Sequence, residues 1–341
     1  MSSSLKKLMA AIIAIGAMQS QGFASTSEIE NFYRARGLSI IVGFSAGGGF
    51  DLYARLLSRH IGKYLPGNPR VVVQNMPGAG SVTAALNILD VAPKDGSVMG
   101  HFGRTVAVTP LMSDRKFDGM RFSWIGSITD EVSVCISSAK SNVKTWQDML
   151  DRTFVVGGEG HESDLDINAN LLKNLFGAKI RLVTGYPGTN EIKPAIERGE
   201  VDGVCGLSYS TLRARYAQEL RDKQINVLVQ VSLKKNPALG DVPFVGYFAK
   251  SEHAPALQLL LEPQEMARPF AAPPGIPPER LAALRAAFDA TMKDSDFLSE
   301  ANKLRLEVNP MKGEDIAKLV AGLYALPKDA GDKARRAMGL E

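Results

Sequence analysis

The sequence predicts an α/β protein of two lobes, each a mostly parallel sheet flanked by helices, with a ligand cleft between the lobes. Three observations predict this fold. Short apolar runs alternate with helical stretches, which is typical of parallel sheets covered on both faces. The same alternation restarts in the second half of the chain. The 341 residues also exceed the usual domain size of about 100–200 residues.

The first 24 residues predict a secretory signal peptide. Lys6 and Lys7 precede an apolar run from Leu8 to Met18, and small residues stand at the −3 and −1 positions of a cut after Ala24. The apolar run is shorter than the roughly 20 residues that a membrane-spanning helix needs. The alternative is an N-terminal core helix. We expect an exported, soluble protein in the periplasm.

Composition and charge narrow the function. Removal of the signal leaves 317 residues with a formal net charge of +2, because two of the 40 basic residues and none of the 36 acidic ones lie in it. This near balance gives no support to nucleic-acid binding. Gly47 and Gly49 resemble part of a dinucleotide fingerprint, but Leu52 stands where its last glycine belongs. The segment 161–166 gathers metal-ligand residue types without a known ligand spacing. We expect neither a cofactor nor a metal.

The predicted elements fall into two similar units followed by a helical tail. Lobe 1 is expected to comprise residues 25–128 and 232–341, and lobe 2 residues 129–231, with the hinge near Trp124–Asp130 and Gln230–Leu233. The expected strands are Leu38–Phe44, Arg70–Gln74, Ser97–Phe102, Val132–Ser137, Thr153–Val156, Ile180–Thr184, Val201–Gly206 and Ile225–Val231. The expected helices are Asp51–Tyr64, Ser81–Val91, 164–176, Glu191–Arg198, Glu279–Lys293, Asp296–Lys303 and Gly313–Leu323.

The chain has two cysteines, Cys135 and Cys205. An even pair in an exported protein favours a disulfide, and two buried free thiols are the alternative. A bridge would close a loop of about 70 residues and contribute around 4 kcal/mol of stability.

Four strand–glycine loop–helix junctions are the candidate binding elements. They follow Phe44, Met76, Val156 and Tyr186. Ligands of open α/β sheets bind at the carboxyl ends of strands, where helix N-termini offer free backbone N–H groups. Glycines let that backbone approach an oxygen ligand closely. Four such loops around one cleft would hold a carboxylate.

An enzyme is the competing interpretation. The residues from Gly43 to Gly47 match the G-x-S-x-G nucleophile elbow, with Ser45 as the nucleophile of an exported serine hydrolase. Only one predicted strand precedes Ser45, and no histidine lies near the end of the chain, where the triad would need one. We therefore expect a binding protein and no catalytic residues.

Several segments resemble the solute receptors of tripartite tricarboxylate transporters, also called the Bug family. The resemblance lies in Val42–Arg55, Val71–Gly80, Pro93–Gly96, Gly185–Gly188, Gly199–Gly203 and Phe270–Pro277. It implies a two-lobed type II periplasmic-binding-protein fold that closes on a small carboxylated solute. It also implies a monomer that delivers the solute to a permease of one large and one small subunit. A sensor that presents the ligand to a membrane kinase stays open.

The resemblance also implies the ligand contacts. Asp51 and Arg55 are expected to stabilise the first loop rather than to touch the ligand. Where the family often has Gly-x-Gly-Ser, this chain carries His161 and Glu162, which would favour a solute with an amine or hydroxyl. The expected contacts are Phe44, Ser45, Ala46, Gly47, Gly48, Gly78, Ala79, Gly80, Ser81, Thr105, Ser163, Tyr186 and Gly188.

Overall fold

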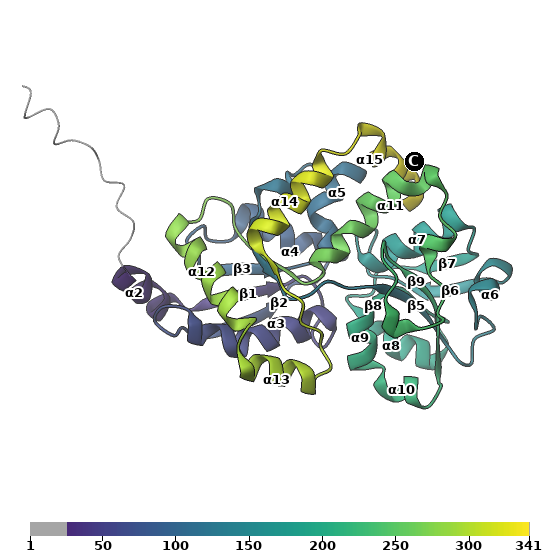
Figure 1. The fold of residues 1–341 in the computed structure, drawn as a ribbon, viewed down its shortest axis with the longest axis horizontal. Helices are drawn as coiled ribbons and strands as arrows, with labels where there is room; N and C mark the ends of the chain where they lie inside the picture. The colour runs from purple at the N-terminus through teal and green to yellow at the C-terminus, as the bar shows by residue number, and fades with distance from the viewer. Residues whose placement is uncertain (1–25, 341) are drawn as a thin grey trace, which may run out of the picture.

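The computed structural model describes residues 26–340 and contains two sheets flanked by helices (Figure 1). The first sheet has the strand order β11-β4-β10-β3-β1-β2, and the second has the order β7-β6-β8-β5-β9. The predicted signal peptide and its cut after Ala24 lie outside the described residues. Within 26–340, no helix is both long and apolar enough to cross a membrane.

The strands are short, as the sequence predicts. Their bounds are β1 Leu38–Val42, β2 Val71–Asn75, β3 Val98–His101, β4 Ser123–Ser127, β5 Ser133–Ser138, β6 Phe154–Gly157, β7 Ile180–Val183, β8 Gly203–Ser208, β9 Ile225–Val231, β10 Pro269–Ala272 and β11 Met311–Lys312. Strands β1, β2 and β3 pair in parallel, as do β6, β7 and β8. Strands β10 and β5 run against their neighbours, and each is the first strand after the chain crosses between the sheets.

Helices separate most of the strands. Their bounds are α2 Thr26–Arg36, α3 Gly49–His60, α4 Val82–Leu86, α5 Thr109–Met112, α6 Trp146–Asp151, α7 Asp164–Phe176, α8 Thr189–Arg198, α9 Tyr209–Arg215, α10 Ala217–Arg221, α11 Ala254–Leu261, α12 Pro278–Thr291, α13 Ser295–Lys303, α14 Gly313–Tyr324 and α15 Lys328–Met338. The α/β class and the two-lobed architecture predicted from the sequence are confirmed.

Side chains alternate across each sheet, so both faces are buried. In β1, Ile40 and Val42 enter a core formed with α3 and α12, whereas Ile41 enters the core formed with α4 and α14. In β5, Val134 faces α8 and Cys135 faces α7. This alternation is what a strand covered by helices on both faces requires. It leaves the strand ends and their loops free to form a site.

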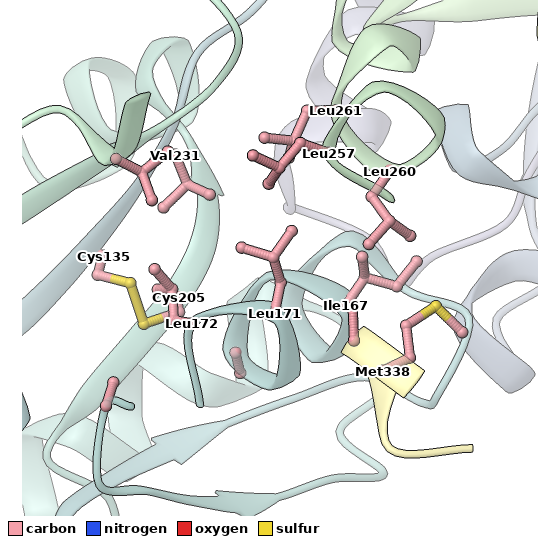
Figure 2. Packing of buried hydrophobic residues seen from close by; sticks show 14 of the residues in the cluster. Cys135, Ile167, Leu171, Leu172, Cys205, Val231, Leu257, Leu260, Leu261 and Met338 are labelled. Carbon is pink, nitrogen blue, oxygen red and sulfur yellow. A yellow bond between two sulfur atoms is a disulfide. The ribbon is translucent and has the colours of Figure 1, made fainter. Parts of the chain in front are cut away.

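The second lobe has a core that includes the end of the chain. Figure 2 shows Leu257, Leu260 and Leu261 of α11 and Met338 of α15 packed around Leu171 and its neighbours on α7. Both α11 and α15 follow the second sheet in sequence, within the segment 232–341 that the sequence assigns to the first lobe. The exact lobe boundaries stay a prediction.

The disulfide predicted from the sequence is present. Cys135 of β5 and Cys205 of β8 are joined, with 4.0 Å between their Cα atoms (Figure 2). The two strands are antiparallel neighbours with an irregular register at this point. The bridge therefore fastens two central strands of the second sheet and leaves no free cysteine in the described chain.

Candidate ligand site between the lobes

The loop between β1 and α3 is shaped by one buried carboxylate, Asp51. Its side chain accepts hydrogen bonds from the Gly47 backbone (2.8 Å), the Arg55 guanidinium (2.8 Å) and the Asn75 amide (2.9 Å). Burial raises the pKa of Asp51, but the hydrogen bonds from Arg55, Gly47 and Asn75 outweigh it and hold the pKa below its usual value. Asp51 and Arg55 therefore stabilise the loop, as the sequence predicts.

The second glycine loop, between β2 and α4, has an unusual backbone. Ala79 and Ser81 adopt positive φ angles of 45° and 77°, beside Gly80 at 59°. The buried Ser81 hydroxyl accepts a hydrogen bond from the Gly103 backbone at 2.7 Å. This bond ties the loop to the segment that follows β3. Strain of this kind persists only where the surroundings hold it in place.

In the second lobe, Asp166 organises the loop between β6 and α7. Its carboxylate accepts hydrogen bonds from the backbone N–H groups of Glu159 (2.7 Å) and Gly160 (3.2 Å) and from the Ser163 hydroxyl (3.1 Å). It also accepts one from the hydroxyl of Thr184. Ser163 in turn caps the N-terminus of α7. The loop is therefore rigid, and its hydrogen-bond donors are largely consumed within the lobe.

Loops of the two lobes touch one another directly. The Ser45 hydroxyl donates to Glu191 at 2.7 Å, and the Ser45 backbone donates to the Pro187 carbonyl at 3.3 Å. The Thr105 hydroxyl donates to the Glu162 carbonyl at 3.2 Å. The structure is therefore a closed arrangement of the lobes.

A small cavity lies between the lobes, beside these contacts. The first lobe contributes the loop after β1, the start of α3 and the residue before β10. The second contributes the loop after β6, the starts of α7 and α8, the end of β8 and the following helix α9. The lining residues are Phe44, Gly48, Gly49, Phe50, Glu159, Asp164, Leu165, Thr189, Gly206, Leu207, Ser208, Thr211 and Arg268.

The cavity walls carry one buried arginine and two acidic side chains, Glu159 and Asp164. Arg268 is 1% exposed, lies over the rings of Phe50 and Tyr53, and donates to the Thr211 hydroxyl at 3.1 Å. On the other wall, Glu159 has a pKa well above its usual value because burial, and then the charges of acidic neighbours, disfavour its ionised form. Asp164 is neutralised by the buried Arg104 at 3.0 Å.

The structure brings most of the predicted contact residues to the line where the lobes meet. Phe44 and Gly48 line the cavity, and Ser45, Gly47, Gly80, Thr105, Ser163 and Gly188 lie at loop contacts between the lobes. Ser81 is buried behind its loop. Ala46, Gly78 and Ala79 are exposed, and Tyr186 is half-buried against the second-lobe core. Their role as ligand contacts stays a prediction.

In the loop between β6 and α7, the acid that faces the cavity is not the one that the sequence analysis expected. Glu162 pairs with Arg115 at 2.8 Å, and His161 is exposed beside that pair, so neither side chain lines the cavity between the lobes. Glu159, three residues earlier, lines it instead. Sequence reasoning also missed Arg268 and Thr211, because only the fold brings these distant segments to the loop after β1.

Among residues 26–340, the surroundings of Ser45 lack the histidine of a serine-hydrolase triad. The Ser45 hydroxyl bonds to a carboxylate, and no histidine of residues 26–340 hydrogen-bonds to it. A serine nucleophile needs an adjacent general base such as histidine. The matched G-x-S-x-G pattern is here part of a loop that contacts the other lobe.

Comparison with solved structures supports the same architecture. The periplasmic binding protein BugD is 20% identical, with a TM-score of 0.69 over 86% of this chain and 97% of that one. MatC from Rhodopseudomonas palustris, solved with bound malate, is 19% identical, with a TM-score of 0.67 over 88% and 98%. A further R. palustris protein, solved with adipate, is 16% identical, with a TM-score of 0.66 over 87% and 96%.

Sequence comparison identifies the family. A protein of Agrobacterium vitis is 27% identical over 231 residues, which are 64% of this chain but only 63% of that protein. A protein of Cupriavidus necator is 23% identical over 320 residues, 91% of this chain and 89% of that protein. The profile of the tripartite tricarboxylate transporter family receptor matches residues 53–328. The chain therefore belongs to this family of periplasmic solute-binding receptors.

Proposed function

We propose that the chain captures a small carboxylate-bearing solute between its lobes and delivers it to a tripartite membrane permease of one large and one small subunit. The observation that carries the proposal is the direct meeting of glycine-rich loops from both lobes, at Ser45 with Glu191 and at Thr105 with Glu162. Loops that meet in this way can enclose a solute and release it when the lobes part.

The chemistry of the loops supports a carboxylate. Most of the predicted contacts lie at or just before the starts of α3, α4, α7 and α8, where helix N-termini carry a partial positive charge. The solved relatives with malate and with adipate hold dicarboxylates on the same fold. We expect the same class of ligand here, with the protein acting as a periplasmic monomer after signal removal at Ala24.

Thermal shift of the mature protein tests this proposal. The panel comprises small mono-, di- and tricarboxylates, amino acids and aromatic acids. A ligand at 100 times its Kd adds about 2.7 kcal/mol of stability, which raises Tm by a few degrees. Stabilisation by acids alone supports the receptor.

An assay of ester hydrolysis gives the result that would contradict the receptor proposal. If no solute raises Tm and an esterase activity disappears in Ser45→Ala, the receptor proposal is wrong and the hydrolase interpretation returns. A receptor carrying Ser45→Ala loses at most one hydrogen bond between the lobes, so its Tm falls by only a few degrees.

A further inference from the structure

A second cavity lies in the second lobe and shares no lining residue with the cavity between the lobes. Its volume of about 340 Å³ falls in the range of roughly 300–1,000 Å³ that is usual for small-molecule sites. Lys193, Ile196 and Glu197 of α8 lie three and four positions apart, so one face of that helix forms a wall. The remaining lining residues come from β5, α10, β9 and the turns beside them: Ser138, Ala139, Lys140, Tyr216, Glu219, Lys223, Gln224 and Ile225.

Tyr216, between α9 and α10, brings an unsatisfied polar group to this cavity. The residue is 3% exposed, and its hydroxyl has no hydrogen-bond partner in the described chain. Burial, and then the charge of Glu219, raises the pKa of Tyr216 above its usual value, so the hydroxyl keeps its proton. Burying a hydroxyl without a partner is costly. An acceptor oxygen of a bound molecule would remove that cost.

Positive charge exceeds negative charge around the cavity. Lys193 is paired with Glu219 at 2.5 Å, so these two charges balance. Lys140 and Lys223 are exposed and have no ion-pair partner within residues 26–340, and Glu197 is the lining acid without a cation. Lys223 has a left-handed backbone with φ of 53°, which glycine would adopt at lower cost. The excess of one positive charge favours a ligand with a single negative charge.

The cavity also has an apolar part, formed by Ala139, Ile196 and Ile225 beside the Tyr216 ring. We propose that this cavity is a second binding site, which takes a small apolar monoanion such as an aromatic carboxylate. The carboxylate accepts a hydrogen bond from the Tyr216 hydroxyl, and the apolar body packs against the two isoleucines. The site lies outside the proposed solute cleft, and the inference does not depend on the receptor proposal.

Isoleucine-methyl NMR of the mature protein tests the inference, with benzoate as the probe. The signals of Ile196 and Ile225 are assigned with Ile196→Val and Ile225→Val. We expect benzoate to shift both signals saturably and to bind about tenfold more tightly than benzamide, its neutral counterpart, or acetate, which lacks the ring. Signals that do not move, or equal affinities for benzoate and benzamide, overturn the inference.

Two variants assign the binding to its residues. Tyr216→Phe should weaken benzoate by about tenfold, the effect of one hydrogen bond to a charged group. It should leave Tm unchanged or raise it, because the hydroxyl has no partner to lose in the described chain. Lys223→Gln should weaken benzoate by about threefold and leave benzamide unchanged. An unchanged benzoate affinity in Tyr216→Phe contradicts the assignment.

Two controls separate this site from surface charge and from the cleft. Lys173→Gln removes an exposed lysine of α7 that does not line the cavity, and should leave the benzoate affinity unchanged. Gly80→Ala crowds the contact with Ser163 between the lobes and should leave the two methyl shifts unchanged. Loss of those shifts in Gly80→Ala would assign them to the cleft and overturn the inference. Failure of the whole solute panel to raise Tm contradicts only the receptor proposal.

Discussion

Asp51 shows how one side chain can fix a binding loop. It is buried, receives three hydrogen bonds from three different segments, and holds the glycine-rich loop against β2. The resemblance to the solute receptors implies this role for Asp51 and Arg55, and in the structure the two residues pair four positions apart on α3.

Replacing Asp51 by Asn should lower the free energy of unfolding by about 1–3 kcal/mol, since the Gly47 N–H and the Arg55 guanidinium lose an ionised acceptor. The pKa of Asp51 is depressed in the folded state, so its contribution is complete above the ordinary value of 3.8. The advantage over Asp51→Asn should disappear as the pH falls through the depressed folded pKa. Urea unfolding at several pH values measures it.

Asp315→Asn is the matched control for Asp51. Asp315 is an exposed acid that pairs with Lys318 at 3.0 Å on a helix surface. Its replacement should change the free energy of unfolding by less than about 0.5 kcal/mol. Equal losses in the two variants would show that Asp51 does not organise its loop.

Site residues could be predicted from the sequence only where a local sequence pattern indicates a binding loop. The glycine loops stand out because helix starts and tight turns need those residue types. No local sequence pattern of this kind singles out Glu159 or Arg268. Their importance comes from sharing one cavity, which depends on how two lobes separated in sequence pack together.

At the scale of elements, the disulfide fastens two neighbouring strands of the second sheet. Cys135→Ala with Cys205→Ala should lower the free energy of unfolding by about 3–4 kcal/mol, because the unfolded chain loses a covalent loop of 70 residues. Denaturant unfolding of the oxidised protein measures the difference. Adding a reductant should destabilise the natural chain and leave the double variant unchanged; destabilisation of both would contradict the assignment.

Three of the elements that the sequence analysis missed carry little periodicity of their own. Helix α11 is apolar nearly all round, with Gln258 as its single polar residue, so almost no polar face marks its period. Strand β4 has the mixed sequence SWIGS without a continuous apolar run, and β10 has only four residues and begins with Pro269. Most other predicted strands and helices occur within a few residues of their expected bounds, because they have either a continuous apolar run or an amphipathic face.

At the scale of the whole molecule, closure depends on a very close approach at Gly80. A Cβ atom at this position would lie 2.5 Å from the backbone nitrogen of Ser163 on the other lobe. Gly80→Ala should therefore hold the lobes apart, weaken solute binding by about tenfold or more, and increase the radius of gyration measured with ligand by small-angle X-ray scattering.

Gly177→Ala separates this wedge effect from backbone strain. Gly177 has the same left-handed backbone, with φ of 76° against 59° at Gly80, but a Cβ there would meet nothing within 4 Å. Both variants should lose about 1 kcal/mol of stability from the left-handed conformation. Only Gly80→Ala should change the affinity and the shape, so equal affinities would exclude a steric role for Gly80.

Because α15 packs on α7 of the second lobe, the chain crosses between the two lobes three times. The chain passes from β4 to β5, returns from β9 to β10, and crosses a third time near Pro327, where α14 on the first sheet gives way to α15 on α7 (Figure 1). Three separate crossings restrict how far the two sheets can move relative to one another more than two crossings would. The three crossings would then limit which loops can meet when the lobes close, whereas the solute would determine when they close.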